Sequence, residues 1–141
     1  MLCERYNSSP EQLKVFGRDE WFAPVASGTN PADAMVVCPC TMGTLGSIAA
    51  GLSDNLIERA ADVMLKEQKK LVLVPREAPF STLHLENMLR LSKMNAVILP
   101  ANPGFYHRPQ SVEAIVDFIV ARILDQLGVQ HELMARWGDD R

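Results

Sequence analysis

Charged side chains follow directly after an apolar run in the segment LVLVPREAPFS at residues 71–81. Four apolar residues lead into Pro75, Arg76 and Glu77, so a buried strand is expected to deliver an arginine and a carboxylate at its carboxyl end. Ligands of open α/β sheets bind at that end. A partly desolvated carboxylate can have its pKa tuned for proton transfer, which makes Glu77 a candidate acid–base group. A structural ion pair between Arg76 and Glu77 is the alternative.

A second strand end carries aromatic and cationic residues. The apolar run AVILP leads into NPGFYHRPQS at 102–111, which contains Tyr106, His107 and Arg108. An aromatic ring beside a cation would suit a phosphate ester with an apolar tail. The alternative is a surface loop whose Ser111 caps the following helix.

Two further cations share one helix. Arg59 and Lys66 are seven residues apart in the helical pattern Asn55–Gln68, which is close to two turns, so both project from one stripe. Such a stripe would suit an anion such as phosphate. A solvated face with acidic neighbours in the same helix is the alternative.

Small and polar residues open another expected helix. Thr41, Met42, Gly43 and Thr44 follow the strand that ends in CPC, and a helix amino terminus offers free N–H groups to an anion or a flavin edge. The segment is neither GxGxxG nor a P-loop. Trp21, in DEWFAPVASG, is an aromatic residue in a loop and a further candidate site residue. The alternative is that its side chain packs from the surface into the core.

Strands and helices alternate from residue 35 onward. Short unbroken apolar strands between amphipathic helices indicate a parallel sheet covered on both faces, in one domain spanning residues 1–141. A further short strand is expected at Leu13–Phe16. The other expected strands are Met35–Cys38, Leu71–Val74 and Ala96–Leu99, and the helices are Gly43–Leu52, Asn55–Gln68, Leu83–Lys93 and Val112–Leu127.

Composition excludes several classes of protein. With 14 basic and 17 acidic residues spread along 141 positions, the chain has no basic block for nucleic acid, and no apolar run approaches the ~18 residues of a membrane span. The amino terminus lacks a signal-peptide core, so a cytoplasmic location is expected. Cys38 and Cys40 lack partners at zinc spacing and are expected to be buried.

Taken together, these stretches resemble the flavin prenyltransferase family of UbiX-type flavoproteins, formerly described as aromatic-acid decarboxylases. The resemblance runs from about Val15 to Trp137 in family order. The matching segments are DEWFAPVASG, VVCPCTMGTL, NLIERAADVMLKE, LVLVPREAPFS, HLENMLRLS, AVILPANPGFYHRPQSVE and VARILDQLG.

The resemblance implies a three-layer, flavodoxin-like parallel sheet and a metal-independent reaction. Family members join a dimethylallyl group from dimethylallyl monophosphate to N5 and C6 of reduced FMN. The prenylated FMN then serves UbiD-type decarboxylases, in ubiquinone biosynthesis or aromatic acid decarboxylation. Closed homo-oligomers, often dodecamers with sites at subunit interfaces, are also implied.

The resemblance also assigns roles to residues. Lys66, Glu77, Tyr106 and Arg122 match the positions that hold the prenyl phosphate, and Arg59 adds charge there. Glu77 would also handle the proton as phosphate leaves. Trp21 and Tyr106 would stabilise the allylic cation through their ring faces. The family's FMN contacts match Thr41, Met42, Gly43, Thr44 and Arg76.

The sequence departs from the family pattern at its amino end. The family's first βα unit, with its Gly-Ala-Ser-Gly-Ala loop around the FMN phosphate, has no counterpart, so the chain is expected to form the carboxyl-terminal two-thirds of the family domain. Two alternatives follow. One is a non-catalytic or incomplete FMN-binding subunit, and the other is a related FMN-dependent cysteine-conjugate decarboxylase.

Overall fold

The computed structural model describes residues 2–134 and residue 138. Trp137, the last residue of the resemblance, lies outside these described residues. The elements in chain order are α1 (Leu2–Arg5), η1 (Pro24–Ala26), β1 (Ala34–Cys40), α2 (Met42–Ala49), α3 (Leu56–Lys66), β2 (Lys70–Pro75), α4 (Thr82–Lys93), β3 (Val97–Ile98) and α5 (Val112–Leu127).

The sheet has three parallel strands in the order β1-β2-β3, which confirms the expected parallel α/β architecture. Val36 pairs with Val72, and Leu73 pairs with Ile98. The strand β2 therefore lies in the centre, and its burial explains why its sequence is an unbroken apolar run rather than an alternating one.

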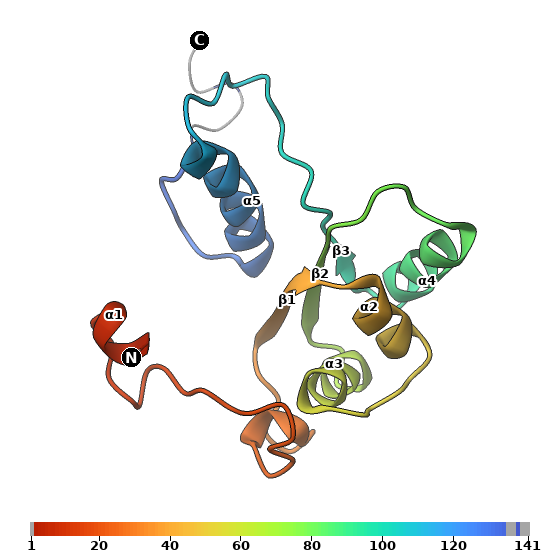
Figure 1. The fold of residues 1–141 in the computed structure, drawn as a ribbon. Coiled ribbons are helices and arrows are strands. Elements are labelled where there is room, and N and C mark those ends of the chain that lie inside the picture. The colour runs from red at the N-terminus through yellow and green to blue at the C-terminus, as the bar shows by residue number, and fades with distance from the viewer. Residues whose placement is uncertain (1, 135–137, 139–141) are drawn as a thin grey trace.

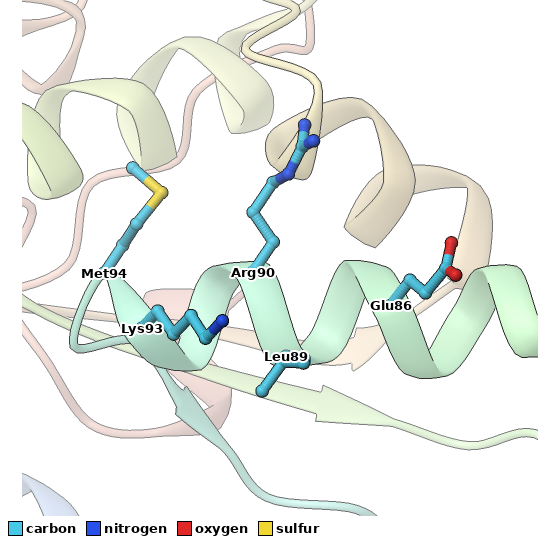
Figure 2. A pocket seen from close by; sticks show the side chains of 5 residues that line it. All are labelled: Glu86, Leu89, Arg90, Lys93 and Met94. Carbon is cyan, nitrogen blue, oxygen red and sulfur yellow. The ribbon is translucent and has the colours of Figure 1, made fainter.

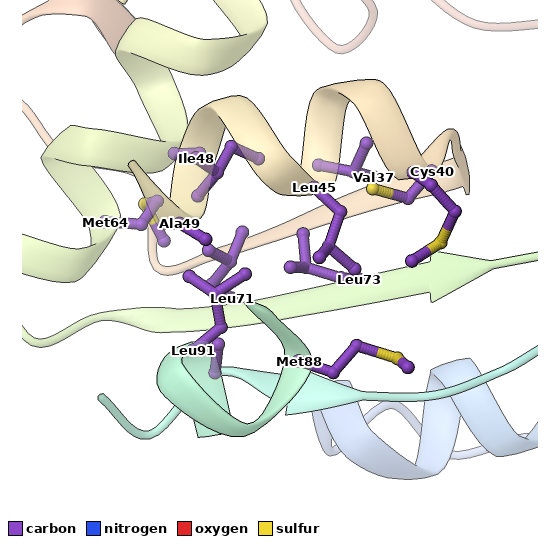
Figure 3. Close-up of a cluster of buried hydrophobic side chains, with 13 residues drawn as sticks. Val37, Cys40, Leu45, Ile48, Ala49, Met64, Leu71, Leu73, Met88 and Leu91 are labelled. Atoms are coloured by element: carbon purple, nitrogen blue, oxygen red, sulfur yellow. The ribbon is translucent and has the colours of Figure 1, made fainter. Parts of the chain in front are cut away.

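Alternate residues of β2 face opposite sides of the sheet. Leu71 and Leu73 belong to the main apolar cluster, which also takes side chains from α2, α3 and α4 (Figure 3). Val72 and Val74 are equally buried but lie outside that cluster, and α5 contacts β2. Figure 1 shows α5 on the other side of the sheet from α2 and α4. Both faces of β2 are therefore covered.

Polar side chains fix where the helices begin. Thr41, Asn55, Ser81 and Ser111 each accept a hydrogen bond from a backbone N–H in the first turn of the helix that follows. This contact satisfies one of the four N–H groups that a helix start leaves without a partner. The helix α2 is shorter than the sequence predicts, because it ends before Gly51, whose φ of 73° breaks the helical path.

Residues 2–33 form an arm with little regular structure. The strand predicted at Leu13–Phe16 is absent, so that prediction is wrong. Four residues cannot form a strand without a neighbouring strand to accept their backbone hydrogen bonds, and the sheet consists of β1, β2 and β3 alone among the described residues. The arm instead packs on α3, where Leu56 N donates to Arg18 O at 2.8 Å.

The central position of β2 gives a stability prediction. Leu73 is 0% exposed, so Leu73→Ala should lower the free energy of unfolding by about 2–5 kcal/mol, the cost of a core cavity. Urea denaturation followed by circular dichroism measures this loss. Leu83→Ala, at a position 64% exposed, is the control and should change stability by less than about 0.5 kcal/mol. Equal losses in the two variants would contradict the central burial of β2.

Candidate active site

The ends of β1 and β2 bring two of the predicted segments together. Cys40 and Pro75 are register partners in neighbouring parallel strands, and Thr41 and Arg76 are the residues that follow them. The backbone after β3 joins the same edge, because Ala101 N donates to Pro75 O at 2.9 Å. Three segments therefore share the carboxyl edge of the sheet. They are the segment that begins at Thr41, the pair of Arg76 and Glu77, and the start of the 101–111 loop.

The start of α2 is open at this edge. Thr41 Oγ1 accepts from Thr44 N at 3.1 Å and lies 3.0 Å from Thr44 Oγ1. A Cβ at Gly43 would meet nothing nearer than Thr41 Oγ1 at 3.8 Å, so a planar ligand could approach the backbone closely. Met42 differs from its neighbours, because its side chain packs in the core. A ligand could therefore contact Met42 through its backbone alone.

Arg76 and Glu77 are exposed, so their expected partial desolvation is not found in this chain. Among the described residues no ion pair joins them, which removes the structural ion pair as an explanation. Glu77 Oε1 accepts from Ala78 N at 3.1 Å. The other carboxylate oxygen remains available for a substrate.

Lys66 lies at the opposite end of β2 from Glu77. It is the last residue of α3, on the turn that leads into β2 at Lys70, whereas Glu77 follows the end of the strand at Pro75. Six strand residues span roughly 20 Å. Figure 1 agrees, with α3 beside the start of β2 and α2 beside its end. Within one chain, Lys66 and Glu77 therefore cannot hold the same phosphate.

Arg59, on the same helix, already has two protein partners. Its Nε donates to Ala26 O at 2.9 Å and its Nη1 lies 3.1 Å from Asp62 Oδ2. The contact with Ala26 ties the arm to α3, whereas Asp62 lies on α3 itself. Trp21 belongs to this arm and its side chain is partly open to solvent, at 44% exposure. The structure therefore places Trp21, Arg59 and Lys66 on the arm and α3, away from the segment that begins at Thr41.

Phe118 of α5 contacts Tyr106 and lines the same cavity as Arg122. The Tyr106 ring meets the Phe118 ring edge-on at 6.1 Å, and the His107 ring stacks on Phe118 at 5.4 Å. Phe118 and Arg122 together line a cavity of about 350 Å³ between β3 and α5. The i,i+4 spacing of Phe118 and Arg122 is the sequence signal that could have identified Phe118.

An acidic partner of Arg122 was missed by sequence reasoning. Arg122 Nη1 lies 2.6 Å from Asp125 Oδ2, and Asp125 Oδ1 lies 3.0 Å from His131 Nε2. The hydrogen bond from His131, with help from the charge of Arg122, holds the pKa of the Asp125 carboxyl below its usual range. The i,i+3 spacing of Arg122 and Asp125 was visible in the sequence, but His131 follows the helix and has no such signal.

The two neighbouring cysteines differ in their surroundings. Cys40 is buried, and burial raises the pKa of its thiol to about 11, so it stays protonated and is not a nucleophile. Cys38 is exposed, contrary to the expectation that both are buried. Among the residues that the structure describes, no three His, Cys, Asp or Glu side chains gather as metal ligands would.

A cavity of about 360 Å³ is lined by residues of α4 and its carboxyl end (Figure 2). It is lined by Glu86, Leu89, Arg90, Lys93 and Met94. Arg90 spans to α2, where its Nη1 donates to Ala49 O at 3.2 Å. None of the predicted site residues lines this cavity.

No described helix is both long and apolar enough to span a membrane.

Known proteins match this chain over most of its length. The family described as Flavoprotein matches residues 4–124. A protein of Pseudomonas aeruginosa named flavin prenyltransferase UbiX is 60% identical over 98% of this chain and 66% of its own length. One of the same name from Halalkalibacterium halodurans is 56% identical, over 100% of this chain and 68% of its own length. The chain belongs to the flavin prenyltransferase family. It spans about two thirds of the length of these relatives.

Solved structures of the flavin prenyltransferase family share the fold. A dodecameric FMN-dependent UbiX-like decarboxylase from Escherichia coli O157:H7 matches with a TM-score of 0.84 and 51% identity, over 86% of this chain and 66% of its own. AnUbiX (PadA1), in complex with FMN and dimethylallyl pyrophosphate, matches with a TM-score of 0.87 and 41% identity, over 95% and 75% of the two chains. The resemblance drawn from the sequence is thereby confirmed, as is the flavodoxin-like fold.

The Asp125 contacts give a prediction about pH. Because its pKa is lowered, the carboxylate stabilises the fold above its unfolded-state pKa, and that contribution is lost as the pH falls through the folded-state value. His131→Ala should move the Asp125 pKa back toward its ordinary value, measured by NMR titration of the side-chain carboxyl carbon. Lys93→Ala, on the distant helix α4, is the control. An unchanged Asp125 pKa in His131→Ala would contradict the assigned hydrogen bond.

Proposed function

We propose that this chain carries the flavin prenyltransferase activity of its family. The reaction joins a dimethylallyl group from dimethylallyl monophosphate to N5 and C6 of reduced FMN, and UbiD-type decarboxylases receive the product. The supporting observation is that the register pair of Cys40 and Pro75 places the open start of α2 beside Arg76 and Glu77. Neither a non-catalytic subunit nor a cysteine-conjugate decarboxylase finds support in the named relatives.

The carboxyl edge of the sheet fits a flavin. The backbone N–H groups at the start of α2 and the hydroxyls of Thr41 and Thr44 would hold polar atoms of FMN. Arg76 adds a cation beside them, and the bare backbone of Gly43 leaves space for a planar ring system. When bound, reduced FMN supplies the electron-rich atoms that accept the prenyl group.

The prenyl phosphate is held by cations and a hydroxyl. Lys66 and Arg122 would stabilise the charge that grows on phosphate as its bond to the prenyl carbon breaks, and Tyr106 would donate to a phosphate oxygen. Glu77 would handle the proton that is transferred as phosphate leaves. It would do so through the carboxylate oxygen that does not accept from Ala78 N. The rings of Trp21 and Tyr106 would each stabilise the allylic cation by roughly 0.5–2 kcal/mol.

These residues can meet if copies of the chain share sites. Lys66 and Glu77 lie at opposite ends of β2, so a phosphate that contacts both must take them from different copies. The arm offers apolar surface for such a contact, because the Phe22 side chain is fully exposed. The Escherichia coli relative is described as dodecameric. We therefore propose a closed homo-oligomer with shared sites. The cytoplasmic location remains a prediction.

Anaerobic incubation with reduced FMN and dimethylallyl monophosphate tests the activity. Mass analysis of the extracted flavin should show one added prenyl unit. Glu77→Gln and Lys66→Ala should each lower the yield by at least about 100-fold, since each removes a charged group from the transition state. Glu113→Gln and Lys93→Ala, matched changes at exposed positions, should leave the yield unchanged.

Unmodified flavin from folded protein would count against the activity of this chain. The same assay on the chain extended with the first third of the Pseudomonas aeruginosa relative then shows whether the added segment gives transfer. No transfer by the extended protein would overturn the proposed function.

Mixing two inactive variants tests whether sites are shared. When Lys66→Ala and Glu77→Gln chains are dissociated together and reassembled at equal ratio, about a quarter of the sites should combine an intact Lys66 with an intact Glu77. Prenyl transfer should then recover to about that fraction of wild type. Variants assembled separately and then mixed are the control. No recovery after joint reassembly would contradict the shared site.

A further inference from the structure

The loop after η1 lies against the last turn of α3, with Gly28 at the point of contact. A Cβ at Gly28 would lie 2.6 Å from Lys66 Nζ and 3.2 Å from Glu67 Cδ, and it would also collide with Glu67 Oε1. Gly28 does not have the positive φ that Gly51 and Gly128 have. Space, and not backbone conformation, is therefore the reason for a glycine here.

The loop cannot retreat easily from α3. Arg59 Nε donates to Ala26 O at 2.9 Å, two residues before Gly28. Within the loop, Ser27 Oγ and Thr29 Oγ1 lie 2.9 Å apart, and Asn30 N donates to Ser27 O at 3.2 Å. An added methyl group at Gly28 would therefore displace the side chains that face it rather than the loop.

Those side chains are able to move. Lys66 Nζ and Glu67 Oε1, which form an ion pair at 3.1 Å, are the far ends of long, flexible side chains that are 48% and 36% exposed. Moving them costs little folding energy, but it changes where the Lys66 charge is presented. A substitution at Gly28 should therefore alter function while leaving stability nearly intact.

We propose that Gly28 is a positioning residue for Lys66, because its bare Cα leaves the space that the Lys66 ammonium occupies. Glu67 holds the ammonium in that space, and Arg59 holds the loop. The gap thereby fixes the position from which Lys66 meets the phosphate of the prenyl donor. The proposal rests on the proposed function, in which Lys66 is a phosphate ligand.

The variant Gly28→Ala tests this role in the FMN-loaded assembly. The KM for dimethylallyl monophosphate should rise about tenfold, as expected when a charge-assisted contact is weakened. The melting temperature should stay within ~3 °C of wild type. Gly17→Ala is the matched control in the same arm, because a Cβ there would meet nothing closer than Glu20 at 3.6 Å. An unchanged KM in Gly28→Ala would overturn the proposal.

A double variant separates positioning of Lys66 from a general effect. Titration calorimetry gives the Kd of dimethylallyl monophosphate for each protein. In a Lys66→Ala background, Gly28→Ala should change this Kd by less than about twofold, because the group that it displaces is gone. If the full weakening remained without Lys66, the proposal would be wrong.

A measurement independent of turnover keeps this inference distinct from the proposed function. Gly28→Ala should shift the 15Nζ resonance of Lys66, which is assigned by its loss in Lys66→Ala. A shifted resonance in a protein that transfers no prenyl group would reject the proposed function and support the placement of Lys66 by Gly28. An unshifted resonance would overturn that placement, whatever the activity.

Discussion

The burial of β2 on both faces is the constraint on which the rest of the structure depends. The side chains from Leu71 to Val74 are 0–1% exposed, and each buried aliphatic side chain contributes about 1.5–3 kcal/mol of transfer free energy. The alternation of these side chains forces helices onto both sides of the sheet. The same strand fixes the distance between Lys66 and Glu77, because both residues are attached close to its ends. The burial of β2 thus both drives folding and separates Lys66 from Glu77 within one chain.

The polar residues at the carboxyl edge and those on α3 are held in place by different kinds of contact. Thr41 and Arg76 follow register partners, so their proximity is set by backbone hydrogen bonds and is insensitive to side-chain packing. Lys66 depends on a loop contact and on Glu67 for its position. The sheet thus sets the arrangement at the carboxyl edge, whereas side-chain contacts set that of Lys66.

Local signals allowed much of the fold to be predicted from sequence. The apolar run at 71–74 and the N-cap residues act within a few positions of one another, so the central strand and the helix starts could be located without tertiary information. The expected strand at Leu13–Phe16 failed because strand formation needs a partner that the sequence does not reveal.

Contacts between distant segments explain what could not be predicted in the site. The spacing of Arg59 and Lys66 on one helical stripe was visible, but the bond from Arg59 to Ala26 joins residues 33 apart. The exposure of Glu77 and the fit of Gly28 against Lys66 likewise depend on tertiary packing. In addition, the opposite placement of Lys66 and Glu77 emerges once β2 is traced between them. The resemblance assigned both residues to one phosphate, but it did not show their separation along β2.

The limited burial of α5 affects how readily this helix unfolds locally. Of its residues, all of which the structure describes, Ala121 alone is buried, and Val112 and Val116 are 71% and 53% exposed. The other apolar side chains of α5 are at most half-buried, so the helix is expected to open at a lower free energy than the sheet. Its amide hydrogens should then exchange with solvent through local unfolding while β2 remains protected. Arg122 would then fluctuate with α5 in an isolated chain. A neighbouring copy that covered Val112 and Val116 would quench this motion.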